Sequence, residues 1–439
     1  MKDNSSTGNS TPYGSKPEKW LILTQYYAPE IGAPQIRLRS LVKELRAHGK
    51  DVSVLTAMPN YPAGRIFDKY RGRLFHQEEI DGVSIKRTWV YAATGKAFMA
   101  RFLNYCSFTI TALALALFGK RPDVLFVEAQ PLPLGIVALL MTYLRGIPYV
   151  YNVPDLQVDV ARELGFIRRS SLLRLAAGLE TLLLKKAWKV STVTHGFMAH
   201  FESRGVPAGR ITFLPNGADT DLLHPQQPDP EFLEKWNLAG KKVFVYAGTH
   251  AFYHGLDTLI DAAEMLKDDP DLRVVMVGNG PERERIRQMA QAKRLTNVVF
   301  GNASYEETGK LYSIAYAAVA TLRDLPVAKG MRLSKVFPAL SCGVPVIYSG
   351  AGEAADLLME NNCGIKTPPE DAGALAAAMR SLARDPDRRN ALGAEGRKVV
   401  EKRYSWATIV ENWLLEVGRT EGRPDVGASR VKAIAAATE

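Results

Sequence analysis

The sequence predicts an α/β protein with two doubly wound parallel-sheet domains. Strand, helix and strand follow one another between Trp20 and Thr56, a βαβ pattern that favours a parallel sheet with a right-handed crossover. A second series of the same kind begins at Lys242. The chain has 439 residues, which exceeds one typical core and favours two or three domains.

The composition is that of a globular protein with a basic surface. Hydrophobic residues make up 46% and charged residues 23%, and the formal net charge is +10. A phosphorylated substrate or anionic lipid explains this charge as well as nucleic acid does, and the chain has no zinc spacing or RNA-recognition signature that supports nucleic acid. The scattered Cys106, Cys342 and Cys363 favour a reducing cytosol without structural disulfides.

The first half of the chain alternates predicted strands and helices. A buried strand at Trp20–Gln25 is followed by a proline-containing loop and by a helix from Ile36 that Gly49 closes. Continuous β-branched runs then predict strands that are buried on both faces. The predicted strands lie at 51–56, 83–92, 123–129, 148–153, 189–194 and 210–216, and the helices at about 97–118, 132–145 and 170–187.

The helix around Phe102–Phe118 is the most apolar segment. Lys96 and Arg101 precede it, Lys120 and Arg121 follow it, and its 17 apolar-rich residues fall short of the about 20 that span a bilayer. Two interpretations stay open. The simpler is a buried core helix, and the other is a helix that inserts one apolar face into an anionic membrane surface.

The domain boundaries follow from turn chemistry. A turn and a proline-rich run after Leu214 divide the domains at 215/216, and strands and helices alternate again from Lys242. Ser405 is the predicted N-cap of a last amphipathic helix. We predict a disordered leader without signal peptide at 1–18, domains at 19–215 and 216–402, a final helix at 403–418 and a flexible tail at 419–439.

The stretch from Lys329 to Asp356 predicts a phosphate site. Lys329, Arg332 and Lys335 recur at spacings of three, so a helical turn would point them the same way. The turn Gly350–Gly352 opens a following helix, whose free amides favour an anion. The alternative is a basic surface helix beside an ordinary βα turn.

Together these segments resemble the family 4 glycosyltransferases of the GT-B fold over residues 19–417. The loop and helix at 26–67 look like those of the subgroup that builds bacterial surface polysaccharides, including L-fucosamine-type transferases. The other matching motifs are LPNGADTDLLHP (214–225), VVMVGNGPERERI (274–286), ALSCGVPVI (339–347) and YSWATIVENWLLEV (404–417).

The resemblance implies two Rossmann-like domains with a cleft between them. The nucleotide-sugar donor would bind mainly to the C-terminal domain and the acceptor to the N-terminal one, onto which the last helix would cross back. It implies a retaining transferase, hexosyl or N-acetylhexosaminyl, that needs no cofactor and acts in lipopolysaccharide or exopolysaccharide synthesis. We expect a UDP-sugar donor, a lipid-linked or saccharide acceptor, no nucleic-acid partner, and a cytoplasmic location, peripheral on the inner face of the plasma membrane if it touches lipid.

A metal site is the weaker expectation. Metal-dependent transferases use an Asp-x-Asp pair to bridge a divalent cation to the diphosphate. The matches at Asp219–Asp221, Asp269–Asp271 and Asp385–Asp387 all have the composition of turns. Without a metal, cations and helix-start amides must stabilise the leaving diphosphate.

The expected donor site departs from the family pattern. In the turn after the first C-domain strand, Thr249 and His254 stand where relatives carry an Arg and a Lys, and a neutral hydroxyl cannot replace a guanidinium. Lys335 is therefore the first candidate for the missing charge and for a catalytic role. The predicted donor-binding residues are Gly32, Thr249, His250, His254, Gly278, Lys329, Arg332, Ser334, Lys335, Gly352 and Glu353.

Two carboxylates typical of the family are missing. Their positions are Gly330 and Pro338 in this chain, and Glu353 is the nearest following carboxylate that can replace one. In the N-terminal domain, Asp155 follows a strand and is the second catalytic candidate, while His195 has the character of a structural residue.

Two other activities remain as alternatives. A nucleotide-sugar epimerase can have the same architecture, and the missing carboxylates fit a catalytically silent binding subunit.

Overall fold

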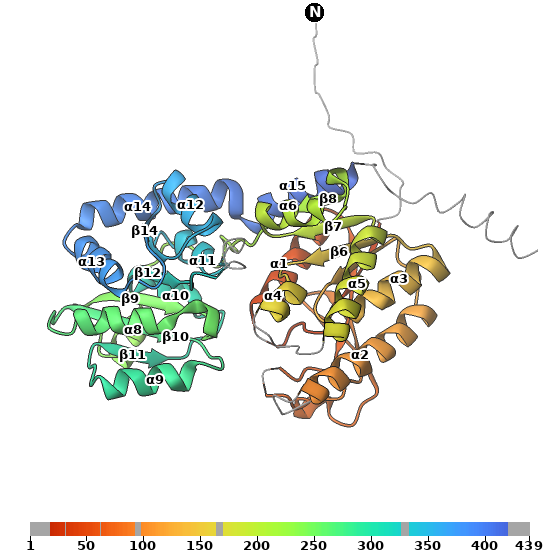
Figure 1. Cartoon of the computed structure of the whole chain (residues 1–439), viewed down its shortest axis with the longest axis horizontal. Coiled ribbons are helices and arrows are strands. Elements are labelled where there is room, and N and C mark those ends of the chain that lie inside the picture. The colour runs from red at the N-terminus through yellow and green to blue at the C-terminus, as the bar shows by residue number, and fades with distance from the viewer. Residues whose placement is uncertain are drawn as a thin grey trace, which may run out of the picture.

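The computed structural model describes residues 18–30, 32–61, 63–92, 98–163, 170–325 and 333–419. Two lobes lie side by side, each around its own sheet (Figure 1). The first sheet consists of β1 (Lys19–Leu23), β2 (Asp51–Ala57), β3 (Phe75–Ile80), β4 (Val83–Thr88), β5 (Val124–Glu128), β6 (Tyr149–Val153), β7 (Lys189–Thr192) and β8 (Ile211–Phe213). Their order is β3-β4-β2-β1-β5-β6-β7-β8, and only the β3–β4 pair is antiparallel.

The second sheet lies in the C-terminal lobe. It consists of β9 (Lys242–Ala247), β10 (Leu272–Val277), β11 (Val298–Gly301), β12 (Ala315–Thr321), β13 (Val346–Ser349) and β14 (Gly364–Thr367). These strands are parallel and follow the order β11-β10-β9-β12-β13-β14. The predicted pair of parallel-sheet α/β domains is confirmed.

Helices cover both faces of the first sheet because its strands alternate apolar side chains between two faces. Leu21 and Leu23 face the core beneath α2, α3, α5 and α6, whereas Trp20 and Ile22 face the core beneath α1 and α15. The N-lobe helices are α1 (Ala33–Ala47), α2 (Phe98–Phe118), α3 (Leu134–Arg145), α4 (Gln157–Glu163), α5 (Ser170–Lys186) and α6 (His195–Ser203).

The second sheet is covered in the same way, with one core on each of its faces. Its lobe holds α7 (Pro230–Lys235), α8 (Leu256–Met265), α9 (Arg283–Ala292), α10 (Thr308–Ser313), α11 (Val336–Ser341), α12 (Glu353–Glu360), α13 (Ala372–Ala383) and α14 (Pro386–Val399).

The last helix, α15 (Trp406–Gly418), belongs to the core of the opposite lobe (Figure 1). Ser405 caps it by accepting a hydrogen bond from the Thr408 N–H, as the sequence predicted. The indole of Trp413 packs edge-on against Trp20 and donates to the Ser191 hydroxyl at 2.8 Å. The C-terminal end of the chain therefore ties the two lobes together.

Two strands, β3 and β14, and several helices, α4 and α6 among them, were not predicted from the sequence. β3 is an edge strand with four polar residues in a row, His76–Glu79, and β14 has only four residues, so neither has the long apolar run typical of a buried strand. The helices α4 and α6 have seven and nine residues, too few for a clear helical period.

Candidate active-site cleft

A cavity of about 900 Å³ lies between the two lobes. It is bordered by the loops that follow the carboxyl ends of strands in both sheets, where open parallel sheets bind their ligands. Residues from the two lobes line it together. Of the predicted site residues, those that line the cavity are Gly32, Asp155, Thr249, His254, Gly278, Ser334 and Lys335.

Two glycine turns form the C-lobe side of the cavity. The Gly248 N–H donates to the Val277 carbonyl at 2.9 Å, and the His250 N–H donates to the Asn279 carbonyl at 2.8 Å. Gly278 has a φ of 133°, and a side-chain carbon there would overlap the carbonyl oxygen of Gly248. Gly278 thus lets the two turns approach each other and exposes backbone to the cavity.

Lys335 places an amine at this turn. Its Nζ lies 2.7 Å from the Tyr246 hydroxyl oxygen and 4.1 Å from the centre of that ring. The same nitrogen lies 3.2 Å from where a side chain on Gly248 would begin. Burial lowers the pKa of Lys335 to about 7. Lys335 therefore brings an amine that can carry a positive charge to this turn, where Thr249 and His254 carry no charge.

The two histidines of the turn are uncharged at neutral pH. Burial, and then the charges of Arg283 and Lys335, lower the pKa of His250 to about 4. Burial also lowers the pKa of His254, helped by Lys335 and His250. Among the described residues, neither nitrogen of the His250 ring has a hydrogen-bond partner. His250 is buried behind the turn and does not line the cavity.

Arg283 is a cation that the sequence analysis did not select. It begins α9 and donates to the Gly278 carbonyl and, at 2.7 Å, to the Asn302 side-chain oxygen. Asn302 lines the cavity, and Arg283 lowers the pKa of His250. The motif NGPER contained the signal, since its arginine comes three residues after Gly280 and begins the next helix.

Asp155 stands on the N-lobe side. It follows β6, and burial raises its pKa to about 6 although the Leu156 N–H opposes the change. Burial, and then the charges of Asp155 and Tyr61, raise the pKa of the Tyr253 hydroxyl in the C-lobe. All three side chains line the cavity. The carboxylate and the two tyrosines therefore line one cavity, Asp155 and Tyr61 from the N-lobe and Tyr253 from the C-lobe.

A buried ion pair supports the same wall. Arg37 on α1 lines the cavity and contacts the Glu128 carboxylate at 2.5 Å, while Asn152 donates to the other oxygen of Glu128 at 2.8 Å. Burial raises the pKa of Glu128, and Arg37 opposes that change. This cluster has no signature in the sequence, because its three members belong to α1, β5 and β6.

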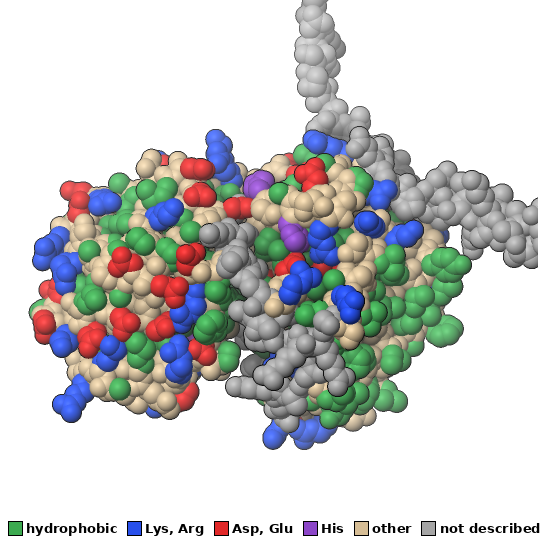
Figure 2. Space-filling model, in the orientation of Figure 1, with side chains coloured by type: hydrophobic (Ala, Val, Ile, Leu, Met, Phe, Trp, Pro, Cys, Tyr) green, Lys and Arg blue, Asp and Glu red, His purple; other side chains and the backbone are tan. Residues whose placement is uncertain are grey.

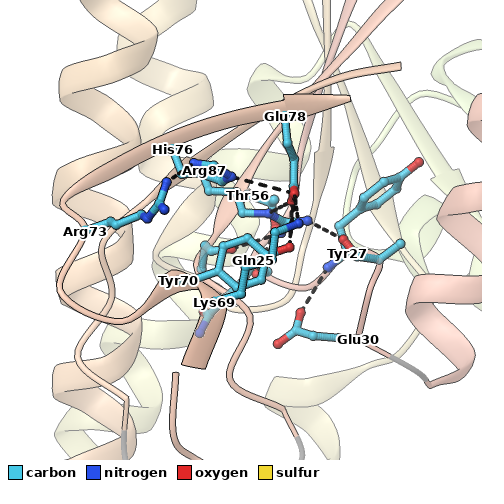
Figure 3. Close-up of polar contacts among 12 residues, drawn as sticks. Gln25, Tyr27, Glu30, Thr56, Lys69, Tyr70, Arg73, His76, Glu78 and Arg87 are labelled. Carbon is cyan, nitrogen blue, oxygen red and sulfur yellow. Dashed lines mark hydrogen bonds and ion pairs between the residues drawn. The ribbon is translucent and has the colours of Figure 1, made fainter. Parts of the chain in front are cut away.

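Two further buried charges hold the loops after β1 and β2 (Figure 3). The Glu30 carboxylate accepts hydrogen bonds from the backbone N–H groups of Tyr27, Asn60 and Tyr61, and burial raises its pKa to about 7. Arg87 donates to the carbonyl of Ala28 and contacts Glu78 at 2.6 Å. This network fixes the loop that carries Tyr61 into the cavity.

Glu353 lies at the contact between the lobes. Its Oε1 accepts a hydrogen bond from the Gly196 N–H at 2.6 Å, and its Oε2 lies 3.7 Å from Nδ1 of His195. Neither Glu353 nor Gly352 is among the residues that line the cavity. This position gives Glu353 a role in joining the lobes, which the sequence analysis did not foresee.

The remaining predicted positions are divided between the cavity and the undescribed part of the chain. Pro338, at one of the two missing carboxylate positions, lines the cavity with an apolar ring. Lys329, Arg332 and Gly330 lie outside the described residues. Of the predicted basic cluster of Lys329, Arg332 and Lys335, the structure thus describes the surroundings of Lys335.

The three Asp-x-Asp segments form turns and caps. The Asp219 carboxylate accepts from the Asp221 N–H at 3.2 Å, Asp269 accepts in the same way from the Asp271 N–H, and Asp385 caps α14. Across the described ranges, no three His, Cys, Asp or Glu side chains gather in a metal-binding arrangement.

Comparisons with known proteins agree with this geometry. Residues 32–217 match the glycosyl transferase 4-like domain, and residues 229–399 match the glycosyl transferases group 1. The chain is 27% identical over 298 residues to WcaI, a glycosyl transferase assigned to colanic acid biosynthesis in Escherichia coli K12. This match covers 64% of this chain and 71% of WcaI. The Escherichia coli O-antigen chain mannosyltransferase C is 25% identical over 269 residues, a match that covers 60% of this chain and 68% of the mannosyltransferase.

A solved structure shows the same fold. The chain superposes on Anabaena HepE, determined in complex with UDP and glucose, with a TM-score of 0.67 and 17% sequence identity. The superposition covers 92% of this chain and 100% of HepE.

Proposed function

The chain belongs to the group 1, GT4-like glycosyltransferases of the GT-B fold, as the sequence predicted, and from this premise we propose its reaction. We propose that it transfers a sugar from a nucleotide-diphosphate donor to a lipid-linked or saccharide acceptor in bacterial surface polysaccharide synthesis. The donor is a UDP-hexose or UDP-N-acetylhexosamine, and the anomeric configuration is retained. The reaction takes place on the cytoplasmic side of the membrane.

One observation carries the proposal. The Lys335 amine reaches the glycine turn after β9 and lines the cavity between the lobes. A diphosphate beside this turn meets the ammonium of Lys335, with Arg283 behind the neighbouring turn. Charge-assisted hydrogen bonds to an ionised phosphate are about twice as strong as neutral ones. Cations thus stabilise the leaving diphosphate, and the proposed reaction needs no metal or other cofactor.

The N-lobe supplies the groups that face the sugar. Asp155 lies opposite Tyr253 and accepts a hydrogen bond from a hydroxyl of the transferred sugar. Tyr61 offers an aromatic ring to the acceptor. Two relatives support the pathway, since WcaI is assigned to colanic acid and mannosyltransferase C to O-antigen chains. HepE, crystallised with UDP and glucose, supports the class of donor.

A donor screen tests the proposal. The protein is incubated with radiolabelled UDP- and GDP-sugars and a bacterial membrane lipid extract, with and without a chelator. Label in lipid or saccharide supports the transferase. Interconversion of the free donor sugar would instead show an epimerase. Nucleotide binding without turnover against any acceptor would show a catalytically silent binding subunit. This is the second candidate function, because the apolar Pro338 stands in the cavity where relatives carry a carboxylate.

A further inference from the structure

Helix α2 has apolar side chains on its outward face as well as on its inward face. The inward stripe of Phe108, Ala112 and Ala116 packs in the core. The opposite stripe recurs every three or four residues and includes Ile110, 67% exposed, and Phe118, 90% exposed. A helix on a water-exposed surface normally carries polar residues on this side. The outward stripe consists of Met99, Leu103, Cys106, Ile110, Ala114 and Phe118.

The neighbouring helices extend this stripe into a surface. α2 packs against α3, and α3 against α5. Tyr143 on α3 is 87% exposed, and Leu144, Leu175 and Leu182 are exposed as well. In Figure 2 hydrophobic side chains gather along the side of the N-lobe where Figure 1 draws α2 and α3. We call the exposed apolar side chains of α2, α3 and α5 the apolar face. Contiguous surfaces of this kind mark docking sites.

The charges around the apolar face identify its partner. Among the described residues, the three helices contain one carboxylate, Glu180, which is buried and paired with Arg204. The exposed cations on α2 and α5 and directly after α2 are Arg101, Lys120, Arg121, Arg174, Lys185 and Lys186. Apolar residues with basic flanks suit an anionic bilayer, because the cations near its surface are attracted to the lipid head groups. Two copies of the chain joined through this face would bring like charges together.

We propose that the apolar face docks on an anionic phospholipid bilayer, with α2 lying along the membrane surface. The apolar segment of α2 runs from Met99 to Phe118, longer than the 17 residues expected from the sequence, and by length and composition alone it could cross a membrane. Its contacts with the lobe hold it against the sheet along its length. Asn104 accepts from the Gln25 amide at 2.6 Å, Thr111 donates to the Trp89 carbonyl at 2.8 Å, and Arg145 donates to the Ala116 carbonyl at 2.8 Å. A spanning orientation would break these bonds and expose the inward stripe.

The N-terminal half of α2 is connected to the cavity by side-chain contacts. The Gln25 side-chain amide donates to Asn104 of α2 at 2.6 Å and to the Tyr26 hydroxyl at 3.3 Å. Tyr26 packs edge-on against Tyr61 with ring centres 5.8 Å apart, and Tyr61 lines the cavity. These tyrosines connect the membrane-facing helix with the cleft. This step rests on the proposed transferase function, and it selects a lipid-linked acceptor over a free saccharide.

Flotation of the full chain with vesicles tests the docking without donor or acceptor. At low ionic strength we expect it to float with vesicles of phosphatidylcholine and phosphatidylglycerol and much less with phosphatidylcholine alone. Ile110→Ser/Phe118→Ser should weaken binding by roughly tenfold or more, because two exposed apolar side chains no longer enter the bilayer. Leu415→Ser is the matched control, since this leucine is 64% exposed but lies on α15, which covers the other face of the sheet.

Three outcomes would overturn the docking. They are a wild-type chain that stays at the bottom with anionic vesicles, a double variant that floats as well as the wild type, and a wild-type dimer that the double variant converts to monomers in size-exclusion chromatography. Circular dichroism melting confirms that each variant folds. Flotation uses no sugar donor, so its failure leaves the proposed transfer intact. A failed donor screen would likewise leave the docking intact.

Discussion

The Nζ atom of Lys335 lies 2.7 Å from the hydroxyl oxygen of Tyr246, which itself donates to the Thr249 carbonyl at 2.7 Å. The tyrosine belongs to β9 and the lysine immediately precedes α11, so this contact joins two elements that border the cavity. The phenol holds the amine against the turn after β9 before any ligand arrives. A preorganised cation of this kind loses little side-chain entropy on binding an anion.

Lys335→Met should weaken the binding of UDP by roughly tenfold or more, because a hydrogen bond to a charged group contributes about 1.5–3 kcal/mol. Isothermal titration calorimetry measures this. Lys267→Met, which removes an exposed lysine of the same lobe, is the control and should bind as the wild type does. Equal affinities of wild type and Lys335→Met would exclude the assigned role of this lysine.

The affinity for UDP-glucose should fall as the pH rises through about 7, the pKa of Lys335. Burial lowers this pKa, so the amine is charged below pH 7 and loses its charge above it. The diphosphate of a sugar nucleotide keeps its charge over this range. Lys335→Arg remains protonated and should bind with little pH dependence. Calorimetry in two buffers of different ionisation enthalpy should also detect proton uptake on binding at alkaline pH, and its absence would contradict the prediction.

Asp155→Asn should lower kcat/KM for sugar transfer by roughly tenfold to a hundredfold while changing the affinity for UDP little. The carboxylate belongs to the N-lobe, whereas Lys335 and the glycine turn that it contacts belong to the C-lobe. Its pKa of about 6 also predicts that activity rises as the pH increases through that value and the group ionises. Asp51→Asn, at the exposed start of β2, is the control. A loss of UDP affinity equal to the loss of kcat/KM would contradict the separation of roles.

Glu353→Ala should separate the lobes and raise KM, because it removes the acceptor for the Gly196 N–H across the cleft. Small-angle X-ray scattering should show a larger radius of gyration without donor. Glu360→Ala removes an exposed carboxylate at the other end of the same helix and serves as control. If both variants scatter as the wild type does, the contact does not hold the cleft closed.

Arg87→Ala should lower the free energy of unfolding by about 3–5 kcal/mol, the range for removing one partner of a buried ion pair. The Arg87 side chain is fully buried and its partner Glu78 nearly so. The variant leaves Glu78 with the exposed Lys69 and the Tyr70 hydroxyl as partners, and the Ala28 carbonyl loses a donor. Urea denaturation followed by circular dichroism measures the change. Arg71→Ala breaks an exposed pair with Asp68 and should change little. Similar midpoints for the two variants would argue against a stabilising role for the Arg87 network.

Much of the site could be predicted because its turns have local signatures. Gly278 belongs to a glycine turn directly after a strand, and Asp155 follows a strand in the other half of the chain. Such positions gather at one edge of a parallel sheet. Arg37 could not be found in this way. Its partner Glu128 lies 91 residues away, and a buried ion pair leaves no pattern in either segment.

The sequence by itself determined the two-domain α/β architecture and the glycosyltransferase family, because strand and helix periods and the family motifs are properties of short segments. Only the tertiary structure decided which distant groups meet. Lys335 and Tyr246 are 89 residues apart, and Glu353 and Gly196 are 157 residues apart. The structure also decided which side of α2 faces outward. The polar Asn104, Ser107 and Thr111 of this helix bond to the lobe instead of facing water, so the usual rule that polar residues face outward does not orient it.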